Sequence, residues 1–316
     1  MTKYHLIALF TILVWGITFI STKVLLFDFT PLQILLVRFL LGLLVLCALR
    51  PHILILTERR HEWLFIGAGL TGVAAYYLLE NIALVFTTAS AVGVIVAASP
   101  LITALLQAVL GDRSALNVRF FLGFILAMIG LIIVGVSSDV AANDAQHLGD
   151  AALLGNLLAF SAAFVWALYS ILVKRIADLG YETIASTKRT FIWGLAFIVL
   201  TYLAAGESSP ALPQFVDPIN IGNLLFLGAI ASAACFVTWG ACVKHLGAAT
   251  STTYIYLVPA ITAVASILIL DEPLTSTIVV GVALTITGLI LSQSSPQGAR
   301  AQTIRNSSPD CDSTFR

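Results

Sequence analysis

Residues 123–132 read GFILAMIGLI, and residues 281–290 read GVALTITGLI. Both stretches carry the pattern Gly-x-x-Leu-x-x-x-Gly-Leu-Ile, and they lie 158 positions apart. Each is apolar enough to belong to a membrane-spanning helix, in which small residues allow close helix packing. The recurrence of this pattern at the same place in each half of the chain indicates an internal repeat.

Two further blocks recur in the same order along the chain. PLITA at 100–104 returns as PAITA at 259–263, at an offset of 159, and the additional residues fall in the longer loop 206–218. The other block consists of an aromatic residue, a lysine and an arginine that return at an offset of 151: Trp15 and Trp166, Lys23 and Lys174, Arg38 and Arg189. Three ordered blocks with one insertion predict two related halves.

The composition requires a lipid environment. Apolar residues make up 59% of the chain and charged residues 10%, and the mean hydropathy is +1.01. Soluble domains average about 45–50% apolar and about 25% charged residues. The net charge is zero, which argues against a nucleic-acid partner. The four cysteines show neither metal-binding nor disulfide-framework spacing, so no metal site is expected.

The hydrophobic pattern predicts ten membrane-spanning helices. A span needs about 20 mostly apolar residues. The connections between the apolar runs are short, so successive helices are expected to be antiparallel neighbours. The predicted spans are 4–25, 31–49, 63–85, 88–110, 118–136, 151–173, 183–204, 220–243, 248–270 and 275–292.

Each half then contains five helices. Because five is odd, the second half enters the membrane inverted relative to the first, and such inverted repeats are typical of alternating-access carriers. A duplication that only builds a stable bundle is the alternative. The predicted units are a first repeat, a periplasmic linker, a second repeat and a disordered cytoplasmic tail: 1–136, 137–150, 151–292 and 293–316.

Loop charges predict the orientation. With the N-terminus placed inside, 13 of the 16 Lys and Arg residues fall in the inner segments, and the outer loops collect acidic residues instead. Positive charge accumulates on the cytoplasmic side of membrane proteins. Both termini are therefore expected in the cytoplasm, with the chain in the inner (plasma) membrane.

These blocks resemble the drug/metabolite transporter superfamily, in its ten-helix EamA branch. The motifs that carry the resemblance are a Trp-Gly pair, an Arg-Phe pair, an ALVFT join and a Pro followed by a Glu: Trp15-Gly16, Arg38-Phe39, 83–87, and Pro259 with Glu272. Two positions depart from the family pattern. Arg113 stands where the first half would carry the Glu, and Val85 replaces a Lys that survives as Lys244 in the second half.

The resemblance implies a secondary transporter that exports or exchanges small organic metabolites, such as amino acids or amphipathic compounds, and carries no bound cofactor. Protons are a candidate coupling ion, and lipid is the surrounding partner; a monomer and a homodimer are both open. The alternative is a non-transporting membrane scaffold or sensor. The sequence contains none of the common catalytic or nucleotide-binding motifs, so an enzyme is not expected.

Glu80 is the sharpest candidate for a binding residue. A charge inside a span costs about 2.5–3.5 kcal/mol on insertion scales and usually faces a cavity. Tyr76 and Tyr77 precede Glu80 by one helical turn and share its face. A structural carboxylate at the helix end is the alternative. The candidate substrate-binding residues are Trp15, Tyr76, Tyr77, Glu80, Asn81, Trp166, Tyr169, Trp239 and Tyr254.

Four further residues are candidates for gating or hinge motion. Arg38 and Arg189 lie within spans; they either attract anions at the two mouths, or they snorkel to headgroups and bond helix-end carbonyls, which is the interpretation we favour. Pro100 and Pro259 interrupt their helices and free backbone carbonyls.

Overall fold

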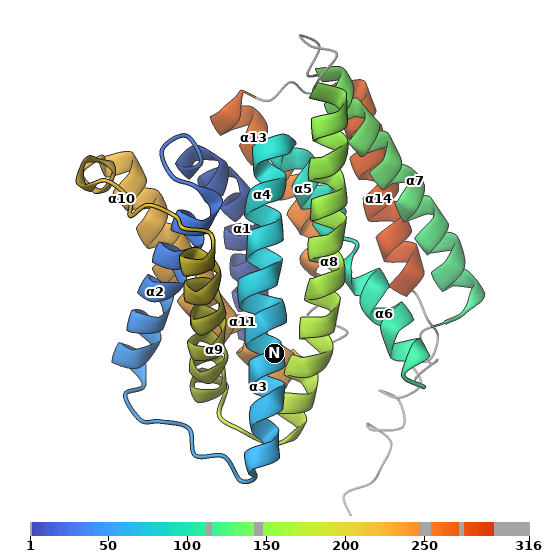
Figure 1. Ribbon diagram of the computed structural model, residues 1–316. Coiled ribbons are helices and arrows are strands. Elements are labelled where there is room, and N and C mark those ends of the chain that lie inside the picture. The colour runs from blue at the N-terminus through green and yellow to red at the C-terminus, as the bar shows by residue number, and fades with distance from the viewer. Residues whose placement is uncertain (1, 112–115, 142–147, 247–253, 272–274, 294–316) are drawn as a thin grey trace, which may run out of the picture.

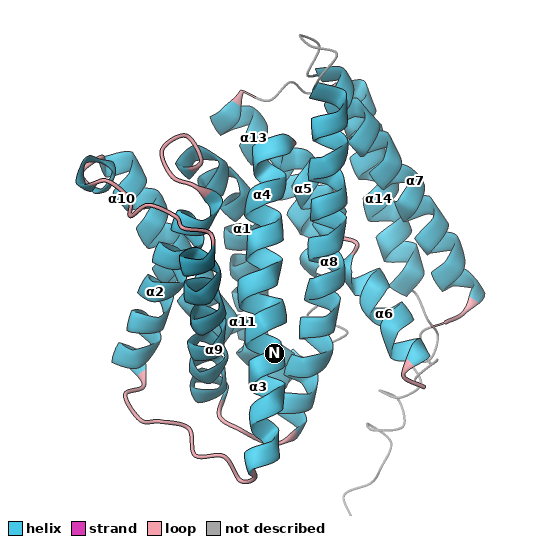
Figure 2. Cartoon of the chain, viewed as in Figure 1, coloured by secondary structure: helices cyan, strands magenta, loops and turns pink. Residues whose placement is uncertain are grey.

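The computed structural model describes residues 2–111, 116–141, 148–246, 254–271 and 275–293. All regular structure within these ranges is helical (Figure 2). Arg113, Glu272 and the predicted tail from residue 294 onward lie outside the described residues.

The first half contains five helical passes that run up and down through the bundle (Figure 1). The third pass is a continuous helix with a π-helical segment in its middle, and the fourth is broken into two helices. The elements are α1 (Thr2–Leu25), α2 (Pro31–Leu49), η1 (Arg59–His61), α3 (Glu62–Gly69), η2 (Leu70–Ala75), α4 (Tyr76–Phe86), α5 (Ala89–Val96), α6 (Ser99–Val109) and α7 (Val118–Ala141).

The second half repeats this plan. Its third pass again contains a π-helical segment, here between α10 and α11, and the described part of its fourth pass opens with the 3₁₀ turn η5, which runs directly into α13. The elements are α8 (Leu148–Asp178), α9 (Thr183–Ala204), η3 (Leu212–Phe215), α10 (Pro218–Leu225), η4 (Phe226–Ala234), α11 (Cys235–Leu246), η5 (Tyr254–Leu257), α13 (Val258–Leu270) and α14 (Ser276–Gln293).

Local sequence explains several helix boundaries. Thr30 caps α2 through a capping box with Gln33, and Pro31 occupies the first helical position. Asp217 caps α10, which also begins with a proline. Helices α7 and α8 extend the predicted spans, so both ends of the predicted linker 137–150 are helical.

The described helices suit a bilayer. Seven are long and apolar enough to cross a membrane, and three shorter apolar helices complete the ten predicted passes. Large apolar side chains such as Leu44, Ile125 and Leu268 are more than half exposed on the bundle surface. In water such an apolar surface would promote aggregation, whereas in a membrane it faces the hydrocarbon chains of the lipids.

Helix contacts reveal a pseudo-two-fold axis that relates the halves. Helices α7 and α14 pack side by side (Figure 1). A Cβ on Gly123 would lie 2.4 Å from the Gly288 carbonyl oxygen, and a Cβ on Gly130 would lie 2.6 Å from that of Gly281. Because the repeat takes Gly123 to Gly281 and Gly130 to Gly288, one contact maps onto the other. The fold is therefore two inverted five-helix repeats.

The same symmetry corrects the predicted pairing of Arg38 with Arg189. A Cβ on Gly228 would lie 3.0 Å from the carbonyl oxygen of Arg38, and a Cβ on Gly69 would lie 2.9 Å from that of Thr190. Thr190, at an offset of 152, is thus the counterpart of Arg38. Alignment by residue type missed this one-residue shift because both arginines occupy the same region of equivalent helices.

Candidate functional site

A cavity of about 50 Å³ lies in the interior between the two halves. Three pseudo-equivalent pairs contribute to its wall, so the cavity straddles the pseudo-two-fold axis: Trp15 and Trp166, Val96 and Ile255, Ser99 and Val258. Its volume is enough for only a few water molecules. The other lining residues are Thr18, Phe19, Tyr76, Tyr77, Glu80 and Ala97.

The fourth passes of the two halves shape this cavity. Pro100 and Pro259 were predicted in mid-helix, but they lie in the first turns of α6 and α13. Helix α6 follows a break after α5, and α13 follows the 3₁₀ turn η5. Proline disfavours a helical conformation in the residue before it and removes one backbone donor, so the preceding turn separates from the helix. Ala97, between α5 and α6, and Ile255, in η5, both line the cavity.

Aromatic rings form the core around the axis. Trp15 and Trp166 meet edge to face at 6.1 Å, and Tyr76 lies 4.6 Å from Trp166. Below them, Phe39 contacts its counterpart Phe191 at 5.1 Å. The indole nitrogen of Trp15 donates to a carbonyl oxygen of η4 at 3.1 Å, which fixes the ring. Such a ring lining offers π faces to an apolar or cationic group.

Glu80 places one carboxylate in the wall of this aromatic cavity. The side chain is 1% exposed, and Tyr76 lies within hydrogen-bonding reach of it. Its Oε1 atom has no hydrogen-bond partner among the described residues. A buried acceptor without a hydrogen-bond partner costs free energy, so this oxygen requires an explanation.

Arg38 is a second buried ionisable residue, and it interacts electrostatically with Glu80. Its Nε donates to the Ser232 hydroxyl at 2.8 Å, and its guanidinium carbon lies 4.1 Å from the centre of the Tyr77 ring. Nη1 and Nη2 have no hydrogen-bond partner within the described part of the chain. The favoured snorkelling interpretation is wrong, because Arg38 is 0% exposed and held inside the bundle.

These two charges give a stability prediction. The double variant Arg38→Met/Glu80→Gln is expected to have a Tm equal to or above that of the wild type. Replacing incompletely partnered buried charges by groups of similar volume is often neutral or stabilising, by about 1–4 kcal/mol. Thermal unfolding of the purified protein in detergent measures this. A Tm several degrees lower would show that the charges hold the fold together.

The nine predicted substrate-binding residues divide into two groups. Five line the cavity: Trp15, Tyr76, Tyr77, Glu80 and Trp166. The other four point elsewhere. Asn81 donates to the Pro31 carbonyl at 3.1 Å, and Tyr254 shares a 2.6 Å hydrogen bond with His5. The ring of Tyr169 packs against that of Trp166 with centroids 4.9 Å apart, and the ring of Trp239 packs against that of Trp15 with centroids 5.2 Å apart.

Sequence reasoning missed the residues near the two prolines and the partner of Arg38. Ala97 and Val258 are ordinary apolar residues by type, although the neighbouring prolines mark their position. Ser232 lies in a run of small residues and carries no separate signal. Glu62 was overlooked because it precedes the predicted third span.

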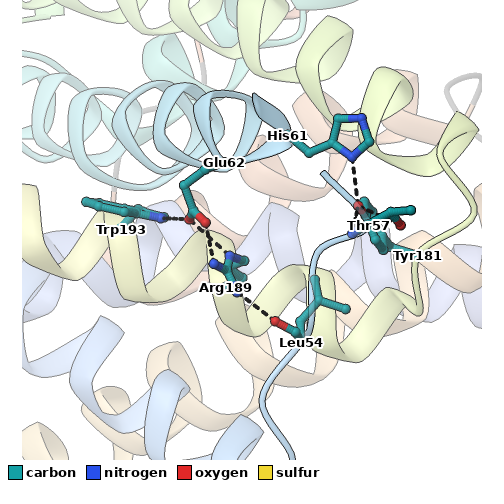
Figure 3. Close-up of polar contacts among 7 residues, drawn as sticks. All are labelled: Leu54, Thr57, His61, Glu62, Tyr181, Arg189 and Trp193. Carbon is teal, nitrogen blue, oxygen red and sulfur yellow. Dashed lines mark hydrogen bonds and ion pairs between the residues drawn. The ribbon is translucent and has the colours of Figure 1, made fainter. Parts of the chain in front are cut away.

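Glu62, the first residue of α3, anchors a polar network at that end of the helix (Figure 3). Arg189 forms an ion pair with Glu62 and donates from Nη1 to the Leu54 carbonyl at 2.8 Å. The indole nitrogen of Trp193 also donates to Glu62, at 2.5 Å. Arg189 therefore bonds a carbonyl of the 50–58 connection rather than a helix-end carbonyl, and in addition has an acidic partner that the sequence did not suggest.

The connection 50–58 is also hydrogen-bonded to α9 and to Tyr181, just before α9. The buried Lys188 ammonium donates to the carbonyls of Arg50 and His52, at 2.5 and 2.6 Å. Tyr181 accepts a hydrogen bond from the Thr57 amide at 3.0 Å (Figure 3). Because this segment belongs to the first half and α9 to the second, the network joins the halves at this end.

At the opposite end the connection 205–217 makes the equivalent tie. Thr30 donates to Glu207 at 3.0 Å, and the Gln33 amide donates to the Ser208 carbonyl at 3.0 Å. Asn220 donates to Asp28 at 2.8 Å. Both ends are thus hydrogen-bonded across the halves, but the network that includes Arg189 and Lys188 contains more charged groups.

Glu62→Gln is expected to loosen the 50–58 connection by about 2 kcal/mol, which is roughly 30-fold faster amide exchange there. The reason is the loss of a charge-assisted hydrogen bond at a partly buried site. Hydrogen exchange read by mass spectrometry over residues 50–62 measures it. Glu207→Gln, at the opposite end, is the matched control and should leave this segment unchanged; equal exchange in both variants would contradict the prediction.

Ten apolar passes in two inverted halves, with an axial cavity beside the broken fourth pass of the first half, define a multi-pass membrane protein built like a transporter. The model of the EamA-like transporter family matches residues 2–136 and 153–293. The chain belongs to the EamA-like transporter family.

Relatives match the chain along most of its length. A protein of Escherichia coli K12 named a probable amino-acid metabolite efflux pump is 26% identical, covering 92% of this chain and 94% of its own length. An uncharacterized transporter of Archaeoglobus fulgidus is 27% identical, covering 92% and 97%. A probable terminal-alkyne amino-acid exporter of Streptantibioticus cattleyicolor is 28% identical over 74% of each chain.

The fold is also found among solved structures. One crystal structure superposes with a TM-score of 0.65 at 18% sequence identity, covering 95% of this chain and 99% of the other. At this level of identity the likeness concerns the arrangement of the helices.

Proposed function

We propose that this chain is a secondary transporter that exports small amphipathic organic solutes bearing an ammonium group. The two repeats, residues 1–136 and 151–292, move against each other and expose the axial cavity to each side of the inner membrane in turn. Both termini face the cytoplasm, as the loop charges indicate. Protons compete with the solute for the cavity carboxylate.

The observation that carries this proposal is the position of Glu80. One buried carboxylate with an unpartnered oxygen lies in an aromatic cavity on the axis between inverted halves. In transporters of this architecture, sites lie at the repeat interface beside discontinuous helices. A carboxylate combined with π faces suits an ammonium group, whose apolar remainder packs against Trp15 and Trp166.

The relatives guide the choice of solutes. Two of them are named for the export of amino-acid metabolites or an amino acid. Amino acids and their amines combine an ammonium group with an apolar or aromatic side chain, which matches the chemistry of the cavity. They are therefore the first solutes to test.

The test uses purified protein in liposomes. Counterflow of radiolabelled solutes is measured across a panel in which each amino acid is paired with its amine and with its deaminated acid. We expect saturable flux of amine-bearing members and none of the deaminated acids. Protein-free liposomes give the background. Equal flux of all three classes, or no saturable flux of any amine, would refute the proposal.

A further inference from the structure

The connection 50–58, which runs along one end of the bundle between α2 and α3, carries large apolar side chains that the protein leaves uncovered (Figure 1). Ile53 is 81% exposed and Ile55 is 87% exposed. The chain then leads into Trp63, which is 73% exposed in the first turn of α3. These three side chains are called the apolar platform.

The outward direction of the two isoleucines follows from the local sequence. Residues 53–56 read ILIL and form neither helix nor strand. Leu54 and Leu56 are partly buried and pack against the core cluster that contains Phe65, whereas Ile53 and Ile55 are exposed. Such alternating burial is typical of an extended chain, in which successive side chains point to opposite sides. Packing of the leucines therefore directs the isoleucines outward.

Polar contacts with α9 hold the backbone of the platform in place. The Lys188 ammonium donates to the carbonyls of Arg50 and His52, and Arg189 donates to the Leu54 carbonyl. Ile53 thus lies between two carbonyls that are bonded to α9. Rotation of this segment toward the core would break these charge-assisted hydrogen bonds, so the apolar side chains stay on the surface.

An arginine without a partner lies beside the platform. Arg60 forms an ion pair with Glu58, with Nε 2.5 Å from Oε2. Arg59 is exposed, and its side chain has no ion-pair or hydrogen-bond partner among the described residues. Because η1 continues directly into α3, Arg59 lies about one helical turn before Trp63. The platform therefore adjoins a guanidinium whose donors are available.

The equivalent connection of the second half shows what is particular to this end. Residues 205–217 also expose large apolar side chains, Leu212 and Val216. However, this connection contains two acidic residues and no Lys or Arg, whereas residues 50–61 contain three arginines and one glutamate. Both ends thus have an apolar surface suited to lipid, but only the end at 50–61 has the charge to attract an anion.

We propose that the apolar platform and Arg59 form a binding site for an anionic phospholipid of the adjoining leaflet. The isoleucines and Trp63 pack against the upper part of the acyl chains, and the Arg59 guanidinium donates to the headgroup phosphate. The platform continues the lipid-facing side of α2, whose last residue, Leu49, is more than half exposed. This site is separate from the axial cavity, so the inference does not depend on the transported solute.

The experiment measures lipid binding to the purified full chain in detergent by native mass spectrometry. Phosphatidylglycerol and phosphatidylcholine with the same acyl chains are titrated in parallel. We expect the first phosphatidylglycerol to bind about fivefold more tightly, which is the effect of one basic residue near an anionic lipid. Arg59→Gln should remove this preference and leave both phosphatidylcholine binding and the Tm in lipid-free detergent unchanged. Equal binding of the two lipids to the wild type, or an unchanged preference in Arg59→Gln, would overturn the inference.

Arg175→Gln is the matched control, because Arg175 is likewise exposed but lies in α8, outside the segment 50–63. This variant should keep the wild-type preference. An equal loss of preference in both arginine variants would indicate diffuse attraction by the basic end of the protein and would overturn the site. Added inorganic phosphate should not displace phosphatidylglycerol, and displacement would show a site for a free anion instead.

The contribution of the platform is tested with Ile53→Ser/Ile55→Ser. Both side chains are exposed, so this variant should fold normally. It should weaken the binding of both lipids to a similar degree, because an apolar surface does not distinguish their headgroups. Unchanged binding of both lipids would remove the platform from the site. A wild-type dimer that this variant abolishes would assign the surface to a second copy of the chain, and either result would overturn the inference.

Discussion

Glu80→Gln is expected to lower the flux of amine-bearing solutes about 100-fold while leaving the protein folded. Glutamine has nearly the same shape as glutamate, so the aromatic packing around it persists. What is lost is the charge that attracts an ammonium group in a site 1% exposed to solvent. Removing one partner of a buried charged contact costs about 2–5 kcal/mol, and about 2.7 kcal/mol corresponds to 100-fold.

Counterflow and proton-driven flux in liposomes measure this effect separately. Loss of both would place Glu80 on the solute path, and loss of proton-driven flux alone would place it on the proton path. Glu58→Gln is the matched control, because Glu58 is an exposed carboxylate whose ion-pair partners, Arg60 and His61, are close to it in the chain. The flux of this variant should equal that of the wild type. Unchanged flux of Glu80→Gln in both assays would show that Glu80 is structural.

Gly288→Val is expected to destabilise the protein by about 3 kcal/mol or more and to reduce its folded yield sharply. A Cβ at this position would lie 2.4 Å from the amide nitrogen of Ala127 and 2.6 Å from the carbonyl oxygen of Gly123. These are backbone atoms, so the clash cannot be relieved by a side-chain rotation. Helices α7 and α14 must separate, and overpacking of this kind is costly.

Thermal unfolding in detergent and the yield of monodisperse protein measure this prediction. Gly130→Val should behave in the same way, because its Cβ would lie 2.6 Å from the Gly281 carbonyl and 2.6 Å from the Thr285 amide nitrogen in the pseudo-equivalent contact. Ile290→Val, on the 54% exposed face of α14, is the control and should leave the Tm nearly unchanged. A normal Tm for both glycine variants would contradict the close packing of this helix pair.

The sequence predicted the helices well because membrane insertion depends on local properties. A span is recognised from the length and hydropathy of one segment, so the ends of α2 and α9 agree with the predicted 31–49 and 183–204. The repeat was also visible, since Trp15 and Trp166 retain their identity. The pairing of Arg38 with Arg189 was wrong by one residue, because equivalence in space depends on helix contacts rather than on residue type.

The cavity could be predicted only in part. Glu80, Tyr76 and Tyr77 stood out because a charge flanked by aromatic residues is rare in a span. Trp239 and Tyr254 have equally suggestive side chains but pack against Trp15 and His5. Residue type indicates what a side chain can bind, whereas the rotation of its helix and the packing of its neighbours decide whether it reaches the site.

The amino-acid sequence by itself thus determined the membrane environment, the ten apolar passes and the inverted duplication of the repeat. Only the tertiary structure decided which residues line the cavity and which buried polar atoms of the described residues lack partners, as Arg38 and Glu80 show. The physical reason is that the free energy of placing a segment in lipid is a sum over the consecutive residues of that segment. A hydrogen bond, a cavity wall or a glycine contact is instead a property of residues that meet from distant helices, and small shifts between those helices change it.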